Sequence, residues 1–280
     1  MPLNSVNTNV GAMVALQSLN RTSDELTATQ KRISTGFRVA DARDDGAAYA
    51  VAERVRGDIA ATTSANEQLG GIKGLLDVTQ ASLQNVSTTL QKLKELTVKL
   101  ADGTITSEQQ SQYQSQVKQL TNNIKSFIED ATYNSRNILD ENNANYQGTS
   151  QVLRNGEGVV YSFSGYAAIA GIYDEISTAN GWDRASASSA ITAGGSLTTA
   201  ISNTLTQLNN FGSYSNFIDT QINYNKAKID AQNSGLGALV DADLAKESAR
   251  LQSLQIRQQL GTQALSISNQ APQTLLSLFR

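Results

Sequence analysis

The residues in this chain that could do chemistry together are the adjacent carboxylates of Asp44 and Asp45. Paired carboxyl groups serve glycoside hydrolysis when both face one substrate. Neighbouring residues on a helix point about 100° apart, so these two would not share a substrate. Two interpretations stay open: an acidic pair that complements the dipole of a helix N-terminus, and a contact between subunits. Arg38 and Arg43 flank the pair and could be its partners, within one chain or between two.

Other residue types that commonly carry catalysis are missing, because the 280 residues include neither His nor Cys. Disulfides, thiolate nucleophiles and zinc–thiolate sites are therefore excluded, and so are the commonest general base and transition-metal ligand. Gly71, Gly74 and the pair Gly156 and Gly158 lack the strand–turn–helix context of a phosphate loop, and we interpret them as turns. The composition predicts a protein that is not an enzyme and holds no cofactor or metal.

The net charge of −3 arises from 22 basic and 25 acidic residues scattered along the chain. Scattered charge argues against a nucleic-acid groove or a contact with an anionic membrane surface. No apolar run is long enough to span a membrane, and the first residues lack the basic opening and apolar core of a secretory signal peptide. The sequence therefore predicts a chain that stays in the cytosol or is exported by a route that reads another signal.

Long helices are predicted before the glycine-rich middle of the chain. Residues 10–34 repeat apolar side chains every seven positions, which keeps a seam facing one partner helix. In residues 75–102 the apolar positions step by three and four, and after a short turn a second helix, capped by Thr106 or Ser107, continues that rhythm. These two segments predict an antiparallel helical hairpin. The first seam consists of Ala12, Leu19, Leu26 and Ile33.

The pattern changes in the middle of the chain and then returns. Residues 152–165 predict a β-hairpin, because the turn dipeptide Asn155–Gly156 lies between β-favouring residues. The helical rhythm resumes at Leu197 and continues to the tail. The predicted fold class is mainly α: long antiparallel helices in coiled-coil or bundle packing, with both termini together, plus a small central insert that contains the β-hairpin.

The C-terminal segment, residues 243–280, carries two apolar stripes on one predicted helix. A helix with two stripes needs neighbours on two sides, so it docks in the core of its own domain or waits for another subunit. Pro272 is expected to end the regular helix. The first stripe comprises Leu244, Leu251, Leu254 and Leu265, the second Ile256, Leu260 and Ile267, and the cluster after the proline Leu275, Leu276, Leu278 and Phe279.

The segment QKRISTGFRVADARDDGAAYAVAER, residues 30–54, resembles the N-terminal signature of bacterial flagellins. There a basic–apolar–Ser–Ser/Thr–Gly run leads into an Asp–Asp–Ala/Gly–Ala stretch. Residues 3–9 and 269–278 are similar to the two ends of the family, with Ala271 where valine is more usual. The central stretch carries no resemblance. The matching signature positions are Arg32, Ile33, Ser34, Thr35, Gly36, Arg38, Asp44, Asp45, Gly46, Ala47 and Ala48.

The resemblance implies a structural subunit that self-assembles head-to-tail into the bacterial flagellar filament for motility. It further implies secretion through the flagellar type III export apparatus with an export chaperone, and contacts with hook-associated junction and cap proteins. The terminal segments would be disordered in the monomer and form a coiled-coil inner tube on assembly. The implied subunit contacts are Leu19, Leu26, Ile33, Leu244, Leu251, Leu254, Leu265, Leu275, Leu276 and Leu278 in the coiled coil, and Arg32, Arg38, Asp44 and Asp45 in the core domain.

Five parts of the chain follow from this interpretation. The terminal segments 1–44 and 243–280 pair with each other, and the core domain consists of a helical hairpin, 45–140, and a returning helix, 186–242. Residues 141–185 form a variable surface insert with the β-hairpin. The insert also has an alternative interpretation, because exposed aromatic side chains stack on sugars whereas buried ones form a core. Its aromatic residues include Tyr146, Tyr161, Tyr166, Tyr173 and Trp182.

Two further alternatives concern the function. The hook–filament junction protein shares the terminal pattern but usually has a weaker ending than residues 269–278. A flagellin-like surface protein with a glycan-binding insert is the other. Many flagellins also carry a stretch read by a vertebrate innate immune receptor, which falls here on Lys92, Lys94, Glu95, Leu96 and Val98. The family has arginines at the two lysines, and the alternative is a solvated helix face.

Overall fold

The computed structural model describes residues 9–177 and 182–278, with side chains up to residue 270. It confirms the mainly α fold class. The chain divides into two compact units, which we call the terminal unit (Met1–Gly57 with Ala231–Arg280) and the central unit (Asp58–Asp230). Among the described residues, no helix has the length and hydropathy of a membrane span.

In chain order the elements are α1 (Val10–Thr35), α2 (Gly46–Ala101), α3 (Ser107–Glu129), β1 (Thr132–Tyr133), β2 (Arg136–Asn137), β3 (Thr149–Leu153), β4 (Val160–Ser164), the π-helix η1 (Ile169–Tyr173), α4 (Asp174–Ser177), α5 (Arg184–Ala190), α6 (Ser196–Val240) and α7 (Leu244–Leu278).

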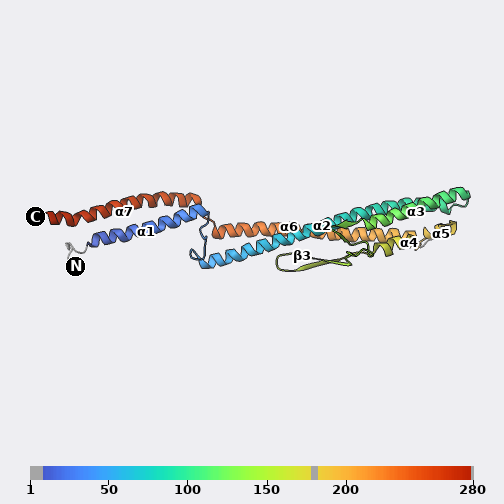
Figure 1. Cartoon of the computed structure of the whole chain (residues 1–280), viewed down its shortest axis with the longest axis horizontal. Coiled ribbons are helices and arrows are strands. Elements are labelled where there is room, and N and C mark those ends of the chain that lie inside the picture. The colour runs from blue at the N-terminus through green and yellow to red at the C-terminus, as the bar shows by residue number, and fades with distance from the viewer. Residues whose placement is uncertain (1–8, 178–181, 279–280) are drawn as a thin grey trace. The chain divides into compact units, whose positions relative to one another are not determined.

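In the terminal unit, α1 and α7 lie side by side and run antiparallel (Figure 1). Two contacts define their register: Asn9 Nδ2 donates to the carbonyl oxygen of Ser268 at 2.7 Å, and Arg32 pairs with Glu247 at 3.3 Å. Asn9 also caps α1, and Gly36, at φ +76°, ends it in the left-handed conformation that glycine adopts without strain. This register brings the start of α1 and the end of α7 to the same end of the helix pair, which agrees with the predicted pairing of the terminal segments.

The expectation that Pro272 ends the C-terminal helix is wrong, because α7 continues to Leu278. Proline lacks one backbone N–H and crowds the carbonyl one turn earlier, which weakens a helix locally. The residues after it still have N–H groups that can bond to earlier carbonyls, so a helix can continue beyond the proline.

In the central unit, α2 and α3 form the predicted helical hairpin. Thr106 accepts a hydrogen bond from the N–H of Gln109, and the Gln109 side chain accepts one from the N–H of Thr106, a capping box that starts α3. The three-and-four repeat of α2 is buried along its whole predicted length and packs with α3 residues such as Val117 and Ile124. The buried α2 positions are Leu76, Thr79, Leu83, Val86, Leu90, Leu93, Thr97 and Leu100.

The predicted β-hairpin is formed by β3 and β4, which pair antiparallel from Thr149–Ser164 to Leu153–Val160. Its turn is longer than a tight dipeptide: Asn155 Oδ1 accepts the N–H groups of Glu157 and Val159, and the positive φ falls on Gly158. The turn is attached to two helices through the buried amide of Asn225. This amide donates to Asn66 Oδ1 and to the carbonyl oxygen of Arg154 at 2.8 and 2.9 Å, and it accepts from Gln221 at 3.0 Å.

Several elements were not predicted. The insert contains η1 and α4 in addition to the hairpin, and β1 and β2 form a second, smaller hairpin. Gly71 and Gly74 do not form turns, because both lie inside α2. Gly74 admits the ring of Tyr133, which would lie within 2.9 Å of any Cβ at that position. Glycine at this point therefore reflects a close approach of a side chain rather than a break in the helix.

Four of the five named aromatic residues of the insert are part of the central core, and the fifth, Tyr146, is half-buried. Trp182 is buried, and Tyr161, Tyr166 and Tyr173 pack against the same core. Tyr161 stacks on Phe217 with ring centroids 4.1 Å apart. Such placement favours the core interpretation over a sugar-stacking surface, because the faces of these rings are covered by protein.

Candidate assembly surfaces

The first surface is the seam between α1 and α7. The predicted seam residues of α1 are half-buried, and on α7 Leu254 is buried while Leu251 and Leu265 are half-buried. The Leu19 side chain approaches α7 closely at Gly261, where a Cβ would lie 3.2 Å from Leu19 Cδ1. The half-buried α1 residues are Ala12, Leu19, Leu26 and Ile33. These predicted contact residues therefore face a partner helix of the same chain.

Not every predicted position takes part in this seam. Leu244, at the start of α7, is 49% exposed. The side chains of Leu275, Leu276 and Leu278 lie outside the described residues, so their predicted role in assembly stays a prediction.

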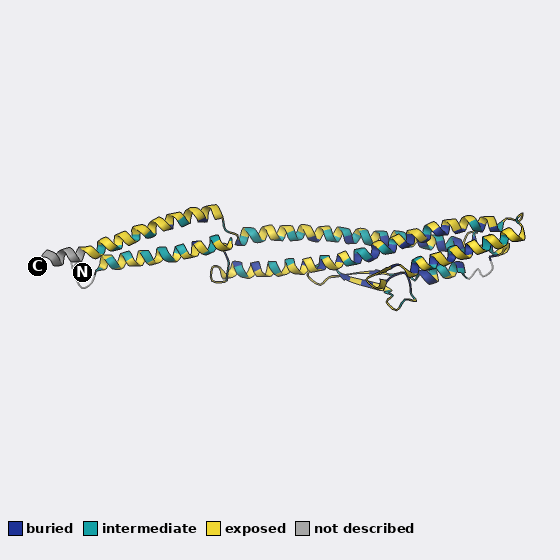
Figure 2. Ribbon diagram, turned by 45° about the horizontal axis from the view of Figure 1, so that its top comes forward, coloured by how far each residue is buried: buried dark blue, intermediate teal, exposed yellow. Residues whose placement is uncertain are grey.

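A second apolar surface of the helix pair is open. The second stripe predicted on α7 lies about 200–240° around the helix from Leu254, that is, on the side opposite the seam. Its members are 58 to 67% exposed. Figure 2 shows both helices as largely exposed, in contrast to the buried stripes of the central unit. We call the exposed apolar side chains of the two helices, taken together, the open stripe. It comprises Ile256, Leu260 and Ile267 on α7, with Val10, Met13, Val14 and Leu16 on α1.

The helix pair is also incompletely packed along its length. A groove of about 500 Å³ follows the pair, lined by Ser18 and Thr22 on one helix and by Leu260, Gly261 and Ala264 on the other. Within α1, only Thr29 is buried. A helix pair of this kind retains much of the exposed surface that its helices have in isolation.

The charged residues of the signature are satisfied within the terminal unit. Lys31 Nζ lies 2.8 Å from both Asp41 Oδ2 and Asp44 Oδ2. This hydrogen-bonded ammonium is the main reason that the pKa values of both carboxyls lie below their usual range. Asp45 instead caps α2, because its Oδ1 accepts the N–H groups of residues 47 and 48 at 3.1 Å. Asp44 and Asp45 thus have different partners, and the interpretation of Asp45 as a helix N-terminal acid agrees with this geometry.

The three arginines predicted around this pair also have partners within one chain. Arg32 pairs with Glu247, and Arg38 Nη2 donates to the carbonyl oxygen of Leu239 at 2.6 Å. Arg43 pairs with Asp41 rather than with its neighbours in the Asp–Asp pair. Sequence reasoning missed Lys31 and Asp41, the centre of this cluster. No local signal identifies them, because the chain reverses direction between them.

The predicted receptor stretch lies on α2 in the central unit. Lys92, Lys94, Glu95 and Val98 are exposed, and Leu96 is half-buried. Glu95 forms an ion pair with Lys99 one turn later, at 2.7 Å. The exposed positions match the interpretation as a solvated helix face.

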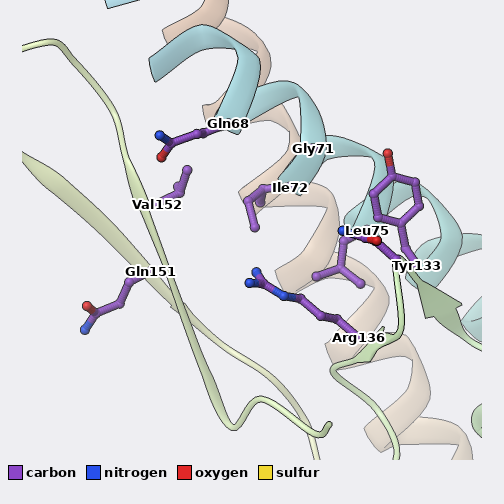
Figure 3. Close-up of a pocket in the computed structure, with 9 residues that line it drawn as sticks. Gln68, Gly71, Ile72, Leu75, Tyr133, Arg136, Gln151 and Val152 are labelled. Atoms are coloured by element: carbon purple, nitrogen blue, oxygen red, sulfur yellow. The ribbon is translucent and has the colours of Figure 1, made fainter. Parts of the chain in front are cut away.

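A hollow of about 350 Å³ lies in the central unit between α2, the β1–β2 turn and β3, and sequence analysis did not predict it (Figure 3). We call it the Arg136 hollow, because the guanidinium of Arg136 points into the space beside Ile72 and Leu75. Its lining residues are Gln68, Gly71, Ile72, Leu75, Tyr133, Asn134, Arg136, Gln151 and Val152.

Family models match most of the chain. The bacterial flagellin N-terminal helical region matches residues 6–144, and the bacterial flagellin C-terminal helical region matches residues 195–279. Flagellin FljK of Caulobacter vibrioides is 36% identical over 281 residues that cover 100% of both chains. A flagellin of Brucella melitensis biotype 1 is 33% identical and covers 99% of both. Neither family model covers residues 145–194, a stretch that includes most of the predicted insert.

Solved structures agree on the fold. The crystal structure of Bacillus cereus flagellin superposes with a TM-score of 0.51 at 21% identity, covering 57% of this chain and 88% of that one. A putative flagellar hook-associated protein from Vibrio parahaemolyticus superposes with a TM-score of 0.56 at 14% identity, covering 71% of this chain and 100% of that one. At these identities the likeness establishes a shared fold.

Proposed function

Since this chain belongs to the bacterial flagellin family and is a structural subunit of the flagellar filament, we propose that its copies join through the open stripe of the α1–α7 pair. Bacterial flagellins are structural proteins, and the filament they form lies outside the cell. The observation that carries the proposal is a helix pair with one stripe half-buried in its own seam and further apolar residues left in contact with water. A large apolar patch on a soluble protein marks an interaction site.

The open stripe contains enough apolar surface to drive assembly. Burying a large aliphatic side chain completely contributes about 1.5–3 kcal/mol relative to leaving it exposed. Seven such residues are between 47 and 67% exposed in the single chain. Burying the remaining surface in a polymer would therefore contribute on the order of 5–10 kcal/mol for each copy before the cost of association. A second copy that presents the same stripe supplies the missing neighbour.

The terminal segments gain their order from this assembly. Fixing the backbone costs about 1–2 kcal/mol of conformational entropy for each residue. Helix α1 contains 26 residues and α7 contains 35. Against this cost, the described side chains of α1 and α7 that are buried are Thr29, Glu247 and Leu254. The separate pair therefore buries too little to offset its chain entropy. Residues 1–44 and 243–280 form the inner layer of the filament, 45–140 and 186–242 the next layer, and 141–185 the surface insert.

The partners at either end of the filament and during export belong to the same proposal. The exposed stripe of an unassembled subunit would aggregate, so an export chaperone that covers it fits the proposed route through the type III apparatus. Hook-associated junction and cap proteins would contact the terminal copies. The full-length identity to flagellins supports the filament subunit over the junction protein.

Electron microscopy after seeding tests the proposal, with the intact chain beside a version truncated at Ala271. Long filaments from the intact chain and none from the truncated chain are expected. Backbone NMR of the monomer is then expected to give sharp, poorly dispersed signals for residues 1–40 and 245–280. Filaments from the truncated chain would show that the tail is not part of the filament lattice. Well-dispersed NMR signals from rigid terminal segments in the monomer would contradict the proposal that these segments become ordered on assembly.

A further inference from the structure

The Arg136 hollow contains the positive charge of one arginine side chain. Among the described residues, the Arg136 guanidinium forms no ion pair or hydrogen bond. Some cations of the central unit form ion pairs, such as Lys125 with Glu129 at 3.6 Å and Lys228 with Glu157 at 3.3 Å, whereas others, such as Lys118 and Lys226, have none among the described residues. Arg136 instead points into a space whose floor is apolar and buried, formed by Ile72, Leu75 and Val152 (Figure 3). A guanidinium beside apolar surface binds anions more strongly than one surrounded by water.

The turn that presents Arg136 is a two-residue β-hairpin turn between β1 and β2. Asn134 and Ser135, the two residues before Arg136, have φ values of +48° and +62°, and no other described non-glycine residue has a positive φ. Positive φ at both central residues is the geometry of the type I′ turn that joins two antiparallel strands, so the pairing of β1 with β2 fixes this turn. The Tyr133 ring packed on Gly74 holds the same turn against α2. Arg136 is therefore presented by a fixed turn rather than by a mobile loop.

We propose that the Arg136 hollow binds a carboxylate side chain from a second copy of this chain in the filament. A planar guanidinium offers a carboxylate two parallel hydrogen bonds. The side-chain amides of Gln68, Asn134 and Gln151 line the same hollow and can donate further hydrogen bonds, while the apolar floor accepts the methylene groups of an Asp or Glu.

Two observations favour a second copy as the source of the carboxylate. The inference rests on the filament function stated above, and a filament places many copies of the same surface next to each other. The chain also has more acidic than basic residues, 25 against 22, so each copy offers carboxylates beyond those needed for its own cations. The contact lies in the central unit and is independent of the open stripe.

Substitution of Arg136 gives a direct test. A hydrogen-bonded charge removed from an interface weakens it about ten-fold or more, so Arg136→Met is expected to raise the critical concentration for seeded polymerisation by that factor. Arg136→Lys keeps the positive charge but loses the two parallel hydrogen bonds of the guanidinium, so its critical concentration should lie between those of the wild type and Arg136→Met. Arg154→Met is the matched control, because it removes the same charge from the exposed turn of the neighbouring hairpin. Wild-type behaviour of Arg136→Met, or an equal loss in Arg154→Met, would overturn the proposal.

Crosslinking identifies the occupant, and the absence of natural cysteine makes a single label possible. Light Gln151→Cys chains that carry a benzophenone maleimide are copolymerised with an excess of ¹⁵N-labelled wild-type chains and irradiated. Mass spectrometry is expected to show light–heavy crosslinks to a peptide that contains Asp or Glu, and none in monomer samples. Light–light crosslinks within one chain as the sole product would show that the hollow has no intersubunit occupant. Filaments would still form in that case, so this failure is distinct from a failure of the filament function.

Discussion

Leu260→Asp tests the open stripe most sharply, because its effects on the monomer and on the filament differ in size. Leu260 is 58% exposed in the single chain, so the substitution should change the stability of the monomer by no more than about 0.5 kcal/mol. In the filament it forgoes about 1–2 kcal/mol of apolar burial and places an unpaired carboxylate in a contact, which costs several kcal/mol more. At about 1.4 kcal/mol for each ten-fold change, the critical concentration should rise about a thousand-fold.

Sedimentation of seeded samples over a concentration series measures this change, and circular dichroism verifies the helical content of the monomer. Leu260→Ala isolates the apolar contribution and should raise the critical concentration about ten-fold. Gln255→Asp is the matched charge control, because it adds the same carboxylate to an exposed position about 140° around α7 from Leu260. Normal polymerisation of Leu260→Asp would refute the reasoning, and an equal block by Gln255→Asp would assign the effect to charge alone.

Two predictions concern other parts of the chain. Asn225→Ala removes three partly buried hydrogen bonds from the attachment of the β3–β4 turn, so urea denaturation should show a loss of about 1–3 kcal/mol in the free energy of unfolding. A loss below about 0.5 kcal/mol would mean that the turn is held by other contacts. Since the pKa values of Asp41 and Asp44 are lowered in the folded state, their pairing with Lys31 stabilises the fold above the ordinary Asp pKa and is lost as pH falls through the lowered values. The N–H groups of residues 40 and 41 donate to Asp44, so in filaments at pH 5 they should be protected from hydrogen exchange. Lys31→Met should remove this protection. Equal protection in both proteins would mean that the fold of the backbone, and not the Lys31 pairing, protects these groups.

The sequence by itself determined the elements whose signals are local. Apolar residues at intervals of three and four specify a buried helix face wherever they occur, so the α2 stripe from Leu76 to Leu100 was predictable position by position. The capping box at Thr106 is equally local, because its hydrogen bonds join residues three apart. The two apolar stripes of α7 could also be predicted from the sequence, because the angle between them depends only on helical geometry.

Only the tertiary structure decided which partner each surface meets. The seam of α1 packs on α7, more than two hundred residues away, and leaves the second α7 stripe open. Asp44 pairs with Lys31 because the chain folds back between them, whereas its neighbour Asp45 points to the start of α2. Arg136 points into a hollow because α2, β3 and the β1–β2 turn meet there. Contacts of this kind depend on where distant segments meet, and no periodicity within one segment encodes that position.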